Sequence, residues 1–108
     1  MKTVDTDNAD GFFEVVAGTD RSQAATMTLS PGQSTGGPEN HHPRADQWCY
    51  VVDGTGIAVV DGEESRLEPG ILVCFEAGEA HEIRNDAGDD GSNEEPLRTI
   101  NVYAPPVY

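Results

Sequence analysis

Three histidines and one glutamine are the residues of this chain whose types and spacing could do chemistry together. His41 and His42 are adjacent, and Gln47 follows five positions after the second of them. The third histidine, His81, lies far down the chain. Neutral imidazole is a common ligand of transition metals, and an amide oxygen can supplement it. These side chains therefore predict a mononuclear site for a divalent transition metal, provided that the fold brings both segments together.

The chemistry of such a site depends on its glutamine. A neutral amide leaves a divalent ion its full charge, whereas a carboxylate would cancel one unit of it. The ion would then be held more weakly, but it would polarise a bound water or an anionic ligand more strongly, as Lewis-acid chemistry requires. Iron, nickel, manganese, copper and zinc all suit this donor set, so the identity of the metal stays open.

The segment that follows the first two histidines has the pattern of a β-strand. Alternate side chains of a strand point to opposite faces, so Gln47 and Cys49 share one face. Trp48 and Tyr50 share the other face, where we expect them beneath a second sheet or at a subunit interface. Asp46 also lies on that outer face and is expected to be structural or exposed.

Short runs rich in β-branched or aromatic residues recur along the chain, with glycine, proline or aspartate between them. They cover residues 12–17, 24–29, 47–53, 57–60, 63–67, 71–75, 81–85 and 97–103. Asp61-Gly62, between two of these runs, is a strong hairpin signal. About eight strands at this spacing, with no helical periodicity, predict one all-β domain, an antiparallel sandwich or barrel.

The remaining segments bound this domain. Residues 1–10 are polar and acidic without periodicity, so we expect a flexible N-terminal segment ahead of a single domain over residues 11–108. Residues 86–95 are polar and acid-rich, but their spacing is not that of a calcium loop, so we expect a hydrated connector. The tail that contains Pro105-Pro106 should lie across a surface, its own or that of a second subunit.

The charge balance excludes some partners. The chain has 20 acidic and 6 basic residues, with a formal net charge of -14. Nucleic acid and anionic membranes repel such a surface, so neither is expected as a partner. The acids are dispersed, which favours a salt-adapted, halophilic surface over an acidic tail for protein partners. With no apolar run of ~20 residues and no signal-type start, we expect a cytoplasmic protein.

Cys49 and Cys74 both lie in apolar runs, and a reducing cytoplasm predicts two buried thiols. Cys49 is also the thiol that could line a pocket beside the metal. The sequence contains no nucleophile elbow, phosphate-binding glycine loop or CxxC pair. Acyl transfer, nucleotide chemistry and disulfide exchange therefore lack their usual sequence support.

The histidine segments resemble the two motifs of the cupin family. In its first motif, two histidines one residue apart are followed by a carboxylate and then by a glycine. His42 and Gly54 match that spacing, with Gln47 in place of the carboxylate. Asn40 stands where the first histidine of the motif would be, and His41 lies beside it. Either a bulge shifts the register or one imidazole ligand is lost.

The second motif is a set of glycines, a histidine and an asparagine at fixed intervals. Gly70, Gly78, His81 and Asn85 fall at those intervals, with Glu76 where proline is usual. Together the two motifs imply a single-domain cupin barrel, or jelly roll. The resemblance to small cupins further implies a homodimer formed through terminal strands and packed sheets.

Three functions remain open at this point. The first is a metal-dependent enzyme, an oxygenase or isomerase acting on a small anionic molecule. Its ligands would be His42, Gln47 and His81, with His41 as a fourth ligand or as a base beside the metal. The second is a non-catalytic module that binds or senses a small ligand in the barrel mouth. The third is a structural dimer with a vestigial site.

Overall fold

The fold is known from a computed structural model that describes residues 1–9, 11–36, 42–86 and 94–108. The strands in these ranges are β1 (Phe13–Gly18), β2 (Gln23–Leu29), β3 (Asp46–Asp53), β4 (Gly56–Val60), β5 (Glu63–Leu67), β6 (Leu72–Phe75), β7 (His81–Arg84) and β8 (Leu97–Ala104). A short 3-10 turn, η1 (Thr6–Asn8), precedes them. Each predicted run is a strand whose ends differ from the prediction by at most one residue. The predicted all-β class is confirmed.

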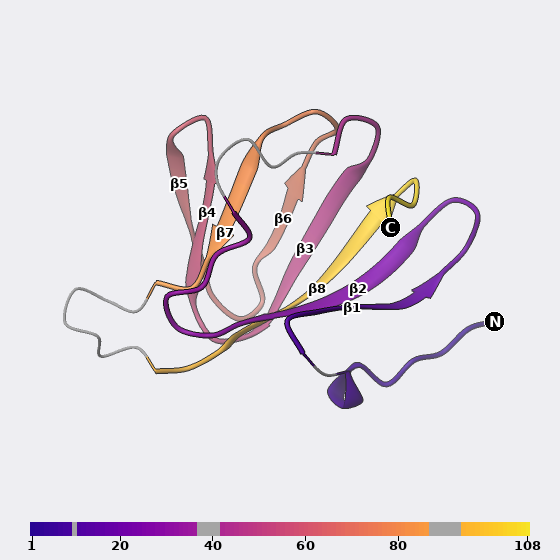
Figure 1. Cartoon of the computed structure of the whole chain (residues 1–108), viewed down its shortest axis with the longest axis horizontal. Coiled ribbons are helices and arrows are strands. Elements are labelled where there is room, and N and C mark those ends of the chain that lie inside the picture. The colour runs from indigo at the N-terminus through magenta and orange to yellow at the C-terminus, as the bar shows by residue number, and fades with distance from the viewer. Residues whose placement is uncertain (10, 37–41, 87–93) are drawn as a thin grey trace.

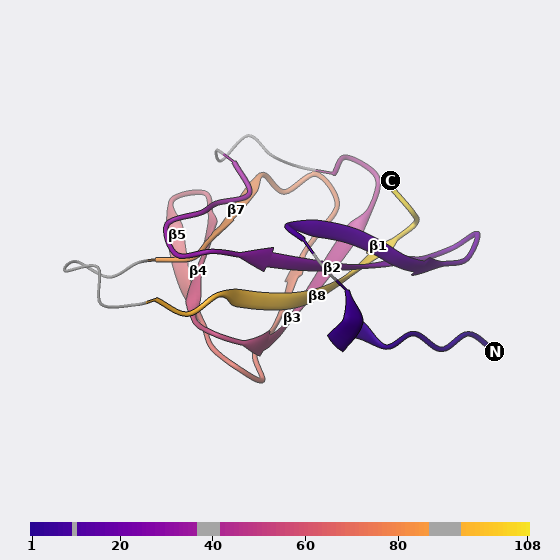
Figure 2. The same ribbon diagram turned by 60° about the horizontal axis from the view of Figure 1, so that its bottom comes forward.

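The strands form two antiparallel sheets that face each other (Figures 1 and 2). The larger sheet has the order β1-β2-β8-β3-β6, and the smaller has the order β5-β4-β7. The last strand, β8, therefore lies between β2 and β3, which precede it by many residues. Within the described ranges, no helix is long and apolar enough to cross a bilayer.

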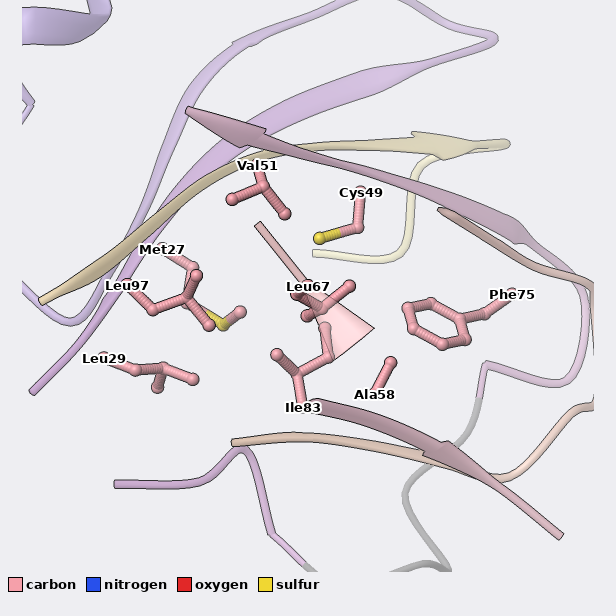
Figure 3. Packing of buried hydrophobic residues seen from close by; sticks show 9 residues of the cluster. All are labelled: Met27, Leu29, Cys49, Val51, Ala58, Leu67, Phe75, Ile83 and Leu97. Atoms are coloured by element: carbon pink, nitrogen blue, oxygen red, sulfur yellow. The ribbon is translucent and has the colours of Figure 1, made fainter. Parts of the chain in front are cut away.

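The core lies between the sheets and is built by alternation along the strands (Figure 3). In β2 every second residue is buried, and in β8 the same pattern holds. The clustered core residues are Met27, Leu29, Cys49, Val51, Ala58, Leu67, Phe75, Ile83 and Leu97. Burying one leucine or phenylalanine side chain contributes about 1.5–3 kcal/mol. The prediction of a buried thiol is confirmed for Cys49 but wrong for Cys74, which is only partly buried near the end of β6.

Two glycine positions are dictated by the backbone. Asp61 and Gly62 have φ of 52° and 77°, the left-handed pair of a type I′ turn, and they join β4 to β5 as predicted. Gly54 has φ of 82°, and a Cβ there would collide with the carbonyl oxygen of Pro96. A glycine at this point lets the end of β3 pass against the start of β8.

The outer face of β3 corrects one expectation. Trp48 and Tyr50 do not pack beneath the second sheet, since they are 45% and 44% exposed. The second sheet covers the opposite face, on which Gln47, Cys49 and Val51 are buried. The division of the chain at residues 10 and 11 stays a prediction, because residue 10 lies outside the described ranges, as do residues 87–93 of the acidic loop.

Candidate functional site

Three of the four predicted metal ligands line one cavity. His42, Gln47 and His81 share a cavity of about 290 Å³ between the inner faces of the two sheets. The other described residues that line it are Phe12, Phe13, Met27, Thr35, Ile83, Tyr103 and Tyr108. The fourth predicted ligand, His41, lies outside the described residues, as does Asn40.

Two hydrogen bonds hold the remote histidine segments together. The backbone N–H of Gly78 donates to the carbonyl of His42 at 2.9 Å, so the loop before β7 is tied to the segment before β3. The N–H of Ala77 donates to Oδ1 of Asp46, also at 2.9 Å. Asp46 is therefore structural, as predicted. This pair of contacts places His81, the first residue of β7, opposite the start of β3.

Both nitrogens of the His81 ring lie near oxygen atoms. Nδ1 is 3.1 Å from the carbonyl oxygen of Glu79, and Nε2 is 3.0 Å from Oε1 of Gln47. The ring also stacks on Phe75, with centroids 4.2 Å apart and planes 10° from parallel. His81 and Gln47 are only 3% and 4% exposed. The stack and the Glu79 contact fix the ring so that Nε2 points at the glutamine.

A chain of buried hydrogen bonds determines which way the Gln47 amide faces. The Met27 carbonyl can only accept, so the Thr99 hydroxyl donates to it at 3.4 Å. Nδ2 of Asn101 then donates to the Thr99 hydroxyl at 2.9 Å. Oδ1 of Asn101 accepts in turn from Nε2 of Gln47 at 3.0 Å. Amide orientation is often ambiguous, but this chain leaves Oε1 of Gln47 facing His81.

Most of this chain matches the sequence profile of one known protein family. The sequence profile of the cupin domain matches residues 25–103. This range covers both histidine segments, all of β3 to β7, and most of β2 and β8. The chain belongs to the cupin family. The predicted cupin resemblance and the jelly-roll barrel are thus confirmed.

Individual relatives of this cupin share the fold at modest identity. It is 37% identical over 59 residues to the tetracenomycin polyketide synthase protein TcmJ of Streptomyces glaucescens, a match that spans 55% of the chain but only 38% of TcmJ. A crystal structure from Bacillus halodurans superposes with a TM-score of 0.83 at 23% identity, over 95% of this chain and 76% of the other. KdgF from Halomonas sp. gives 0.75 at 26% identity, over 88% of this chain and 78% of KdgF.

The cavity of this cupin offers donors that fit a metal ion. Two ligands at ~2.1 Å from one ion, at a right angle, lie ~3 Å apart, and Nε2 of His81 and Oε1 of Gln47 are 3.0 Å apart. The ring of His42 is 5.8 Å from that of His81 between centroids, a separation that two imidazoles on one ion can span. Among the described residues, however, no group of three or more His, Cys, Asp or Glu side chains converges.

Donor and acceptor counting at His81 also favours a cation. Nδ1 faces a carbonyl and Nε2 faces the oxygen of Gln47, yet a neutral imidazole carries a single N–H. If Nδ1–H donates to Glu79, as a metal-bound histidine usually donates to a carbonyl, the lone pair of Nε2 faces the lone pairs of Oε1. A cation shared by Nε2 and Oε1 would resolve that conflict, and so would a second proton on the ring.

The rest of the described lining consists of apolar side chains and the hydroxyl groups of one threonine and two tyrosines. Burial of Tyr103, which is 3% exposed, raises its pKa well above the usual range, and the neighbouring Tyr108 adds to the increase. Its hydroxyl is therefore protonated at neutral pH. Cys49 is not among the lining residues, so the expectation that it could line the pocket is wrong. Its side chain belongs to the apolar core instead.

The chain of hydrogen bonds and the two tyrosines that line the cavity were missed by sequence reasoning. Asn101, Thr99 and Tyr103 all lie on the inner face of β8, at every second position. Polar residues at the inward positions of an alternating strand were the available signal. Tyr108 carried no such signal, because its place depends on how the tail folds back.

Proposed function

We propose that this cupin is a metal-dependent enzyme, of oxygenase or isomerase type, that acts on a small organic molecule in the cavity. Its divalent ion would be held by His42, Gln47 and His81, with His41 as a candidate fourth ligand. What supports the proposal is the pair of donor atoms, Nε2 of His81 and Oε1 of Gln47, that face each other at 3.0 Å. A bound ion would supply polarisation of a substrate oxygen or, if redox-active, activation for oxygenation.

The side chains of this cupin would do the positioning. Asn101 holds the amide of Gln47 so that its oxygen faces the cavity, and Glu79 orients the ring of His81. Tyr103 keeps its proton and can donate a hydrogen bond. None of the described lining residues is a lysine or an arginine, so the anionic substrate expected from the sequence would depend mainly on the ion for its attraction.

Metal content tests this proposal. We expect about one ion per chain after loading with iron, nickel, manganese, copper or zinc, measured by elemental analysis of the purified protein. His81→Ala should retain at least about tenfold less metal under competition from a chelator, because it removes a direct ligand. Gln33→Ala, which deletes an exposed glutamine outside the cavity, is the control for general effects. Equal metal retention in the wild type and His81→Ala would eliminate the site.

A non-catalytic binding module is the second candidate. It is favoured by the neutral character of the donors, since the described residues bring together two imidazoles and one amide but no carboxylate cluster. In that case the protein would stay metal-free when metals are supplied, while small ligands would still raise its melting temperature.

We also propose a homodimer formed through the outer face of the larger sheet. Tyr50 pairs with Leu72 and Trp48 with Val102 across neighbouring strands, and all four side chains are exposed. On a chain with a net charge of -14, this uncharged patch lets two copies meet without bringing acidic groups together. Light scattering should give a dimer for the wild type and a monomer for Trp48→Glu; a monomeric wild type would overturn the dimer.

A further inference from the structure

Aromatic rings form a continuous wall along one side of the cavity. The rings of Phe13 and Tyr108 lie 4.8 Å apart, and those of Tyr108 and Tyr103 lie 5.2 Å apart. Tyr103 meets His42 edge to face, at 5.1 Å and 81°. Rings at such distances and tilts interact favourably and present both faces and edges to a further ring. The wall therefore suits a flat ring better than a puckered one.

Apart from the tyrosine hydroxyls and the His42 ring of the wall itself, the described lining of the cavity has few polar groups. Gln47 and His81 form its polar centre, and the hydroxyl oxygen of Thr35 already accepts from the backbone N–H of Ile83 at 3.0 Å. A ligand with many hydroxyl groups would lose hydrogen bonds to water that these few groups could replace only in part. A single oxygen, in contrast, could meet the Gln47–His81 pair.

The size of the cavity limits the ligand further. A volume of about 290 Å³ lies at the lower end for small-molecule sites. It corresponds to about ten water volumes, at ~30 Å³ each. One ring or two fused rings fit in such a space.

Tyr108 is the most exposed ring of the wall, and it lines the cavity from the C-terminal tail. It lies beyond the end of β8, which stops at Ala104, and the tail folds back over its own chain. The side-chain amide of Gln23 holds it there, because Nε2 donates to the Tyr108 carbonyl at 2.7 Å and Oε1 accepts from the Tyr108 N–H at 2.9 Å. The residue remains 62% exposed.

We infer that the cavity binds a flat, uncharged aromatic molecule that carries one oxygen, and that Tyr108 is the specificity-determining wall against which its ring lies. The inference rests on the proposed function only in taking this cavity as the ligand site. It narrows the substrate class, and it replaces the small anion expected from the sequence with a neutral aromatic molecule.

A matched pair of probes tests the ligand class. 2-Naphthol is flat and uncharged at neutral pH, while decahydro-2-naphthol has the same carbon skeleton and hydroxyl group but is saturated and puckered. Calorimetry on the full chain, with and without added metal, should show 2-naphthol binding about tenfold more tightly, because the ring-to-ring contacts are lost in the saturated probe. Malonate, a small dianion, should bind more weakly than 2-naphthol to the metal-free protein.

Variants of the tail test the role of Tyr108. Tyr108→Ala should reduce the ratio of the two affinities to about two to three, because the other rings of the wall remain, whereas Tyr108→Phe should keep it. Gln23→Ala, which releases the tail, should lower the ratio to an intermediate value. Val107→Ala is the control, because Val107 belongs to the same tail but does not line the cavity. A circular dichroism melt of each variant shows that it is folded.

The outcomes separate this inference from the proposed function. Equal affinity of the wild type for the two probes would overturn the aromatic ligand class, and so would tighter binding of malonate to the metal-free protein. An unchanged ratio in Tyr108→Ala would overturn the role of Tyr108. Metal content, measured on the same samples, tests the proposed function separately. A protein that prefers 2-naphthol but binds no metal would contradict the metal-dependent enzyme and support the aromatic ligand class.

Discussion

The two ends of the barrel interior differ in character, although the same strands build both. At one end Leu29 of β2 is paired with Leu97 of β8, and both side chains are fully buried in the core. At the other end Gln23 is paired with Tyr103 on the same two strands, and there the interior is hollow. Dense apolar packing stabilises the first end. The second end leaves that packing incomplete and gains a cavity with polar groups.

This contrast shows how stability and chemistry are divided along a strand. The inward row of β8 changes from leucine to threonine, asparagine and tyrosine between Leu97 and Tyr103. Alternation along β8 points all of these side chains into the barrel. The fold therefore requires that these positions be buried, but it does not require a particular residue type at each of them. The identity of each buried residue decides whether that part of the barrel interior is packed core or cavity.

The largest expected effect compares one residue from each end. Leu97→Ala should lower the free energy of unfolding by about 2–5 kcal/mol, because it removes methyl groups from the packed end and leaves a cavity. Tyr108→Ala at the hollow end should cost about 1 kcal/mol or less, since the side chain is more than half exposed. Urea unfolding measures both values. Equal losses of unfolding free energy in the two variants would show that side chains at the hollow end stabilise the fold as much as those at the packed end.

The second prediction concerns Cys49, which lies where the two ends meet. Burial raises the pKa of its thiol to about 11, and a hydrogen bond with Thr99 offsets part of the increase. The unfolded thiol, with a pKa of ~8.5, loses its proton first as the pH rises. The stabilisation is therefore complete below about pH 8.5 and is lost as the pH rises toward the folded pKa of about 11.

Urea unfolding between pH 8 and 11 measures this effect. The wild type should lose about 2–3 kcal/mol more than Cys49→Ala over that range, since one pKa unit corresponds to about 1.4 kcal/mol. Tyr103 is present in both proteins, and burial is the largest cause of its raised pKa, with Cys49 only a lesser one, so most of its own titration cancels in the difference. Parallel curves would mean that the thiol is not held in an apolar environment.

The strands could be predicted to within one residue because their signals are local. Alternation and turn residues such as Asp61-Gly62 require no knowledge of the partner strand. The convergence of His42, Gln47 and His81 on one cavity could also be predicted, but from the spacing of the family motifs. The local pattern alone does not state which strands become neighbours.

The parts that could not be predicted all depend on non-local pairing. Asn101 meets Gln47 because β8 inserts between β2 and β3, and strand register of this kind has no signal in the segment itself. Tyr108 reaches the cavity only because Gln23, at the far end of the chain, holds it. Alternation places Trp48 on the face of β3 opposite Gln47, as the structure shows. It does not indicate which of these two faces the second sheet covers.

A smaller effect is expected from the residue that orients Gln47. Asn101→Leu removes the acceptor for Nε2 of Gln47, so the amide can rotate, and metal affinity should fall about 10–100-fold. Asn101→Asp retains an acceptor at the same place and should stay within about threefold of the wild type, despite the cost of a buried carboxylate. Competition with a chelating dye measures both affinities. Equal losses in the two variants would show that orientation is not the cause.

The smallest effect is expected one hydrogen bond further along, at Thr99. Thr99→Val keeps the shape of the side chain but removes its hydroxyl, so Asn101 loses the acceptor that fixes its orientation. Gln47 can still donate to Asn101, and the bond from Thr99 to Met27 is the longest of the chain at 3.4 Å. Metal affinity should therefore fall only about two- to threefold. A loss as large as that of Asn101→Leu would mean that the polar residues of β8 act as one unit, and that the boundary between core and site lies nearer the packed end.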